Sequence, residues 1–133
     1  MQHITGIARN QMVFTSLEDS ISEDNSVRFV DAFVENIDLK ALGFELQMLK
    51  TEGRPSFSTQ TFLKIYLYGY LNGLRSSRKL EKECVRNIEL QWLLFGLVPN
   101  YHSISDFRKN NPSGLKKLFK VFVSFLKDAD LIA

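Results

Sequence analysis

Apolar residues recur every three or four positions along most of the chain, which is the spacing of helices that bury one face. The first such stretch follows a polar run, and its inward positions are Val27, Val30, Phe33 or Val34, and Ile37. Asn25 or Ser26 can begin this helix, because either side chain can accept a hydrogen bond from a free N–H of the first turn. Residues 39–42 predict a short second helix, which Gly43 would end.

Residues 59–72 are apolar on nearly every side. A helix without a polar face belongs in the middle of a bundle. Ser58 can cap its start, and Asn72 and Gly73 can end it, because both tolerate a left-handed backbone. Gly69 inside this helix costs about 1 kcal/mol relative to alanine, unless a neighbouring segment needs the space.

Further helical stretches follow this central segment. Ser76 or Ser77 begins one of them, and its shared apolar face consists of Leu80, Cys84 and Ile88. Helical spacing continues to residue 95, with a kink expected at Asn87. Residues 103–106 resemble a capping box and predict a further start at Ser103. The last helix begins at Ser113, and its apolar stripe consists of Leu115, Leu118, Phe119, Phe122, Phe125 and Leu126.

The pattern contains no alternating strand, so we predict an all-α fold. The expected architecture is a compact bundle of five to seven helices over residues 23–133, after an irregular N-terminal arm over residues 1–22. A length of 133 residues with 44% hydrophobic residues suits one domain with a proper core. The loop over residues 95–103 is longer than the turn of a compact helix-turn-helix, so a divergent helix-turn-helix stays open as an alternative.

The composition indicates the cellular compartment of the protein. The single cysteine, Cys84, excludes an internal disulfide and a cysteine-rich zinc site, and it fits a reducing compartment. The first residues lack the basic start and apolar run of a signal peptide. No apolar run approaches the roughly 20 residues that span a bilayer. We therefore expect a cytoplasmic protein, associated with the nucleoid if it binds DNA, and no membrane partner.

The net charge of +2 hides a strong segregation of charge along the chain. Residues 1–49 hold three basic and eight acidic residues, whereas residues 50–86 hold eight basic and three acidic ones. The basic part is a candidate surface for a polyanion. The alternative is that the two parts neutralise each other within the fold.

The sequence contains few residues in patterns that would indicate an enzyme. His3 and His102 lie far apart, and neither has a cysteine or histidine at metal-ligand spacing. Cys84 falls on an apolar helix face, where cysteine behaves as a small buried hydrophobe. Asp31 and Glu35 share a helix face, which we interpret as a solvated surface. No glycine-rich phosphate loop is present, so we expect neither a cofactor nor an autonomous enzyme.

Two basic stretches remain as candidate sites. The first comprises Arg75, Ser76, Ser77, Arg78, Lys79 and Lys82, and the second comprises His102, Ser103, Ser105, Arg108 and Lys109. Both lie near helix starts or ends, where free N–H groups, hydroxyls and cations can contact phosphate, and arginine can also read a guanine edge. Alternatively, Arg78, Lys79 and Arg86 pair with Glu81, Glu83 and Glu89 on helix surfaces, each pair contributing about 0.3–0.5 kcal/mol.

Several short motifs together resemble one family. They are Gly53-Arg54-Pro55, Tyr70-Leu71-Asn72-Gly73, Arg75-Ser76-Ser77-Arg78-Lys79-Leu80-Glu81, Arg86-Asn87, Trp92-Leu93 and Asp106-Phe107-Arg108, with SLEDSISEDNSVRFVDAFVE near the start. The chain resembles the N-terminal domain of bacterial insertion-sequence transposases, in the eleven-eighty-two group of the insertion-sequence-five superfamily. Asn100 and Ser103 depart from the aspartate and threonine that the family often has there.

The resemblance implies a helical domain that binds the double-stranded terminal repeats of a mobile element. It also implies a following catalytic domain, whose Asp-Asp-Glu residues would hold divalent metal ions. Because the given chain ends at Ala133, about where that domain would begin, we expect it to lack strand-cutting activity. The alternative function is a protein-protein interaction module that forms a homodimer or packs on the catalytic domain without contacting DNA.

Overall fold

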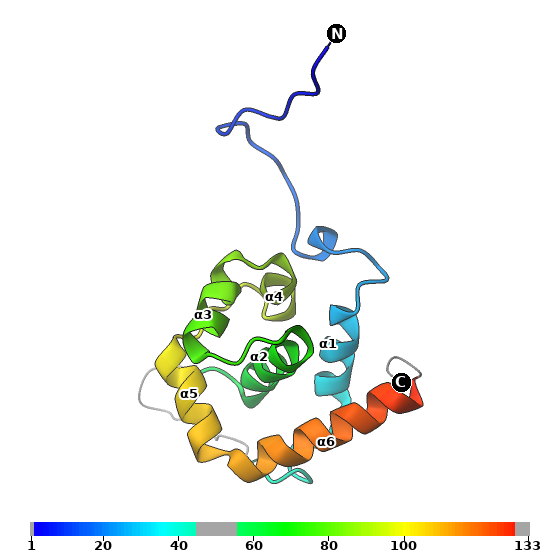
Figure 1. Cartoon of the computed structure of the whole chain (residues 1–133), viewed down its shortest axis with the longest axis vertical. Coiled ribbons are helices and arrows are strands. Elements are labelled where there is room, and N and C mark those ends of the chain that lie inside the picture. Colours follow the sequence, from blue (N-terminus) through cyan, green and yellow to red (C-terminus); the bar gives the residue numbers. More distant parts are fainter. Residues whose placement is uncertain (1, 45–55, 130–133) are drawn as a thin grey trace.

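The computed structural model describes residues 2–44 and 56–129, and within these ranges the chain is helical without strands. This confirms the predicted all-α bundle (Figure 1). The elements in chain order are the 3-10 helix η1 (Glu18–Ser20), α1 (Val27–Asn36), α2 (Thr59–Asn72), α3 (Ser77–Arg86), α4 (Ile88–Leu93), α5 (Tyr101–Asn110) and α6 (Pro112–Asp128). The Gly-Arg-Pro motif at residues 53–55 lies outside the described residues.

Helix α2 forms the centre of the bundle, as its apolar sequence predicts (Figure 1). Ser58 caps its start by accepting a hydrogen bond from the Thr61 N–H, and Gly73 ends it with a φ of 71°. All residues from 61 to 69 are buried. Helices α1 and α4 both pack on α2, so this helix shares contacts with much of the core.

Aromatic rings join the outer helices across the core. Phe33 of α1 contacts Phe122 and Phe125 of α6, with ring centroids 5.0 and 5.3 Å apart. Phe107 of α5 stacks on Phe62 of α2 at 4.8 Å. The predicted stripe of α6 faces inward, since Leu115, Leu118, Phe122 and Leu126 are buried. Such aromatic pairs contribute roughly 0.5–1.5 kcal/mol beyond the burial of their area.

The interpretation of Asp31 and Glu35 as a solvated face is only partly right, because Glu35 is exposed but both acids also bind a buried lysine. Both carboxylates reach across to α2, where Lys64 Nζ lies 2.9 Å from Asp31 Oδ1 and 2.8 Å from Glu35 Oε1. Lys64 is only 3% exposed. Burial opposes its charge, but the hydrogen bonds to Asp31 and Glu35 outweigh this effect and raise the pKa of Lys64. The ammonium also lies 5.2 Å from the centroid of the Phe95 ring.

The expected short helix over residues 39–42 is absent. This segment forms turns instead, because the Asp38 carboxylate accepts hydrogen bonds from the N–H groups of Lys40 and Ala41. Gly43 adopts a φ of 89° and reverses the chain. The local side-chain acceptor therefore competes with continued helix formation.

The N-terminal segment contains more structure than an irregular arm. Glu18 of η1 bonds Arg28 at 2.6 Å and accepts a hydrogen bond from Trp92 Nε1 at 3.1 Å. The Arg28 guanidinium lies over the Trp92 ring at 5.0 Å, and the hydrogen bond from Arg28 is the main reason why the pKa of Glu18 is lowered. Residues 2–17 are exposed and extend away from the helices (Figure 1).

Two predicted helix starts and one predicted helix face need adjustment. Asn87 separates α3 from α4 at the expected kink, and its Oδ1 accepts the N–H groups of Glu89 and Leu90. Ile88 then turns outward and is 50% exposed, so it leaves the face formed by Leu80 and Cys84. Helix α5 begins two residues before the predicted start at Ser103, because Asn100 accepts the Ser103 N–H. Helix α6 begins at Pro112 rather than at Ser113.

No helix in the described ranges combines the length and the apolar character that crossing a membrane requires.

Candidate functional site

The turn between α2 and α3 places the first basic stretch at the surface. The Gly69 carbonyl accepts the N–H groups of Gly73 and Leu74, the latter at 2.8 Å. Ser76 then caps α3 by accepting the Lys79 N–H at 3.4 Å. The two flanking caps leave Arg75 exposed at the turn, in a fixed relation to both helices. A hydroxyl that accepts one bond can still donate its proton, so Ser76 keeps a donor for a ligand.

The cations of α3 lie on the side of the helix opposite its buried face. Leu80 and Cys84 are buried, whereas Arg78, Lys79 and Lys82 are exposed. Arg78 stacks over the Tyr101 ring at 4.7 Å, which joins α3 to α5. Stacking occupies one face of the guanidinium without neutralising it, so the charge of Arg78 stays available. Ser77 is half-buried at the first position of α3.

The second basic stretch divides over two sides of α5. Tyr101, Ser105 and Arg108 follow at helical spacing, so they share one side of α5, and Tyr101 at its start meets α3. His102 and Lys109 are exposed on the adjacent side. Ser103 is half-buried, and it lies five positions before Arg108 and therefore on another side of α5.

One cleft combines residues from both stretches. It has a volume of about 540 Å³ and lies between the end of α2, the α2–α3 turn, the end of α5 and the first half of α6. Arg75 and Arg108 both line it, and Lys116 of α6 adds a third cation that the site prediction missed. We call this depression the cation cleft. Its remaining lining residues are Tyr66, Gly69, Tyr70, Gly73, Leu74, Pro112, Leu115 and Phe119.

The cleft cations are not neutralised by neighbouring acids. Among the described residues, no carboxylate lies within 4.0 Å of any cation in the cleft or of Arg78, Lys79, Lys82 and Lys109. The predicted surface pairing occurs for Arg86, which bonds Glu83 at 2.5 Å. Glu81 and Glu89 serve other partners, accepting hydrogen bonds from the Tyr101 N–H and the Tyr68 hydroxyl. Positive charge therefore accumulates on this surface.

The buried side chains of Tyr66, in the cleft lining, and of Cys84, on α3, stay neutral. Burial raises the pKa of Tyr66 to about 12, and its hydroxyl donates to the Ile104 carbonyl. Burial likewise raises the pKa of Cys84 to about 11, which removes the thiolate that a nucleophile needs. In the part of the chain that the structure describes, no three His, Cys, Asp or Glu side chains are placed to hold a metal ion. The cleft offers charge and shape for binding.

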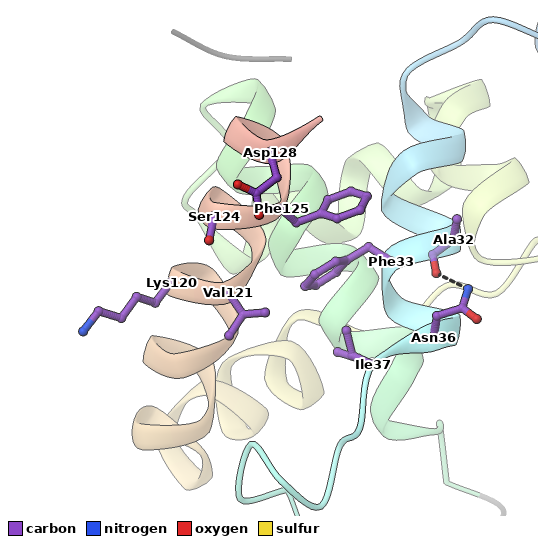
Figure 2. A pocket seen from close by; sticks show the side chains of 9 residues that line it. All are labelled: Ala32, Phe33, Asn36, Ile37, Lys120, Val121, Ser124, Phe125 and Asp128. Atoms are coloured by element: carbon purple, nitrogen blue, oxygen red, sulfur yellow. Dashed lines mark hydrogen bonds between the residues drawn. The ribbon is translucent and has the colours of Figure 1, made fainter. Parts of the chain in front are cut away.

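A second depression lies between α1 and α6 and has a volume of about 660 Å³. Figure 2 shows Phe33 and Phe125 pointing toward each other between the two helices, while Lys120 points away. The other lining residues are Ala32, Asn36, Ile37, Val121, Ser124 and Asp128. The Asn36 side chain donates to the Ala32 carbonyl at 2.7 Å. We call this depression the α1–α6 groove, and its walls are mainly apolar.

Replacing Gly69 with alanine should displace the turn that carries Arg75. A Cβ at this position would lie 2.6 Å from the Leu74 carbonyl oxygen and 3.1 Å from Leu80 Cδ2. The backbone at Leu74 must then move, and the net loss in the free energy of unfolding should be about 1–2 kcal/mol after the gain in helix propensity.

Urea unfolding measures this loss, and Gly6→Ala is the matched control because nothing lies within 4 Å of that position. A Gly69→Ala variant as stable as the Gly6→Ala control would show that the turn accepts a side chain.

Comparison with known proteins assigns the family. A family model described as a transposase domain (DUF772) matches residues 15–110, which extend from just before η1 to the end of α5. The match includes both basic stretches, but α6 with Lys116 lies beyond it. The searches of curated proteins and of solved structures give no significant match. Since the family model covers well over half of the 133 residues, the chain belongs to the family of transposase domains described as DUF772.

Proposed function

We propose that this transposase domain binds double-stranded DNA at the ends of its mobile element, through the cation cleft and the exposed side of α3. The observation that carries the proposal is the meeting of Arg75, Arg108 and Lys116 around one cleft without acidic partners. The three cations come from three separate segments, namely the α2–α3 turn, α5 and α6. Arg78, Lys79 and Lys82 extend the charge along α3.

The proposal assigns a positioning role to most of these contacts. Phosphate contacts fix the orientation of a protein on the duplex, and base-edge contacts specify the sequence. Arg78 is the candidate for a base contact, because its guanidinium is already oriented by the Tyr101 ring and keeps free N–H donors. We also propose that the domain belongs to the eleven-eighty-two group of insertion-sequence transposases. In full-length relatives, a catalytic domain would follow it.

Binding should depend strongly on salt and on the cleft cations. With about four phosphate contacts, the logarithm of the association constant should fall against the logarithm of salt concentration with a slope of roughly −4. The Arg75→Ala/Arg108→Ala/Lys116→Ala variant should weaken binding at least about 10-fold at 0.1 M salt and flatten the slope. Fluorescence anisotropy with a duplex of the element's own end, compared with a scrambled duplex, measures both quantities.

A matched triple variant separates local contacts from net charge. Lys40→Ala/Lys120→Ala/Lys127→Ala removes the same charge from exposed positions outside the cleft. Its affinity should stay within about twofold of the unmodified domain, since distant exposed charges are screened. Equal losses in the two variants, with circular dichroism showing that both are folded, would refute the cation cleft as the DNA contact.

The α1–α6 groove supports a second candidate function, namely a protein interaction surface that forms a homodimer or contacts another transposase domain. Val121 at its wall is 43% exposed, although it neighbours the fully buried Phe122. Light scattering coupled to size-exclusion chromatography tests for the dimer over a range of concentrations. If it forms through this groove, Val121→Asp should shift the protein to the monomer, and a monomeric unmodified domain would reject the homodimer.

A further inference from the structure

We propose that the cation cleft takes up one unpaired nucleotide of the DNA, whose base enters the cleft while its phosphate meets the cations at the rim. This inference rests on the proposed DNA binding and adds that the domain prefers ends with unpaired bases. The shape of the cleft motivates it. Its volume of about 540 Å³ lies within the range of small-molecule sites, whereas contact with an intact duplex backbone needs no such hollow.

The walls of the cleft have the chemistry that a base requires. The Tyr70 and Phe119 rings lie together, with centroids 5.3 Å apart and planes inclined by 40°. Tyr70 is 54% exposed, so much of its ring lacks a protein neighbour. Leu74, Pro112 and Leu115 complete an apolar lining. Aromatic side chains in nucleic-acid channels hold unpaired bases by stacking, largely without regard to sequence.

The charges are complementary to the rest of a nucleotide. Arg75, Arg108 and Lys116 approach the same cleft from the turn, from α5 and from α6. An arginine can hold a phosphate through two parallel hydrogen bonds, and a lysine adds a point charge. A purely apolar ligand would leave these three cations without a partner, and an inorganic phosphate would leave the aromatic wall without one. A nucleotide satisfies both parts of the lining.

The lining of the cleft also includes two glycines. Gly73 lines the cleft with a φ of 71°, and a Cβ there would meet nothing within 4 Å. Gly69 lines it from the last turns of α2. Tyr66 is already engaged, because its hydroxyl donates to the Ile104 carbonyl. Among the lining aromatics, Tyr70 is therefore the residue whose replacement tests stacking without disturbing the core.

The test compares three DNA molecules of the same end sequence: a blunt duplex, a duplex with two unpaired nucleotides at its end, and a duplex with an internal mismatch. Anisotropy at one fixed salt concentration gives the three affinities. We expect the duplex with the unpaired end to bind about 10-fold more tightly than the blunt duplex, as one stacked base provides. The Tyr70→Ala variant should lose this preference, whereas Tyr70→Phe should keep it.

Each other outcome overturns the inference. Equal affinities for the blunt and unpaired ends, or equal losses on every DNA in Tyr70→Ala, would exclude stacking in the cleft. If the preference for the unpaired end is absent but the blunt duplex binds and the triple cation variant weakens that binding, only this inference fails and the proposed function survives. If no DNA binds, both fail. Displacement of the DNA by micromolar deoxyadenosine monophosphate would assign the cleft to free nucleotides instead.

Discussion

Neutralising both carboxylates that hold Lys64 should lower the free energy of unfolding by about 3 kcal/mol. The Asp31→Asn/Glu35→Gln variant keeps the shapes of these side chains but removes both charged partners of the Lys64 ammonium. Lys64 is only 3% exposed, so its charge would then be buried without compensation. Removing the partner of a buried charge costs about 3–5 kcal/mol, and the lower end applies because the Glu35 side chain is 52% exposed. Urea unfolding with linear extrapolation gives the value.

Two further variants identify the cause of this loss. Glu23→Gln/Asp24→Asn removes two exposed acids just before α1 and should change stability by less than about 0.5 kcal/mol. Adding Lys64→Met to the destabilised variant should recover most of the loss, because a buried ion pair replaced by an apolar side chain is often neutral. No recovery would show that Asp31 and Glu35 act through contacts other than Lys64.

The pH dependence of the free energy of unfolding provides an independent test of the role of Lys64. The raised pKa of Lys64 gives stability that is complete below pH 10.5 and is lost as the pH rises through the folded-state value. Without the carboxylates, burial is the main effect and lowers this pKa. The variant should therefore become more stable as the pH rises from 7 to 10, whereas Lys64 contributes no such rise in the unmodified domain. A variant whose stability difference from the unmodified domain is constant over this range would contradict the assignment.

Replacing Phe122 with alanine should cost about 3–5 kcal/mol, which is typical for the loss of a buried phenyl ring. Phe122 is completely buried, and it holds α6 against α1 through the contact with Phe33 at 5.0 Å. The Val121→Ala variant is the matched control on the same helix, because Val121 is 43% exposed. We expect it to lose no more than about 0.5 kcal/mol in the same urea titration. Similar losses for the two variants would mean that α6 is not anchored by this ring.

Local chemistry made the central helix predictable from the sequence. Ser58 and Gly73 mark the ends of α2 because each solves a hydrogen-bonding or backbone problem within a few residues. Prediction from local sequence failed where another nearby side chain accepted the backbone hydrogen bonds. Asn100 caps α5 in place of Ser103, and Asp38 closes a turn where a short helix was expected.

The site was only partly predictable, because its members meet through tertiary packing. Arg75 and Arg108 each stood out in a basic stretch, but nothing in the sequence indicated that they share a cleft. Lys116 is one of several lysines off the apolar stripe of α6, and only the packing of α6 brings it near them. Conversely, Lys64 belongs to the most basic part of the sequence but adds no charge to this surface, because it is buried and paired with two acids of α1.

The bonds of Glu18 to Arg28 and to Trp92 anchor the segment that precedes η1. These bonds fix one end of the exposed segment over residues 2–17, which carries the fully exposed side chain of Ile4. A fully extended chain spans about 3.5 Å per residue, so Ile4, which lies 14 residues before Glu18, can stand at most roughly 50 Å from it.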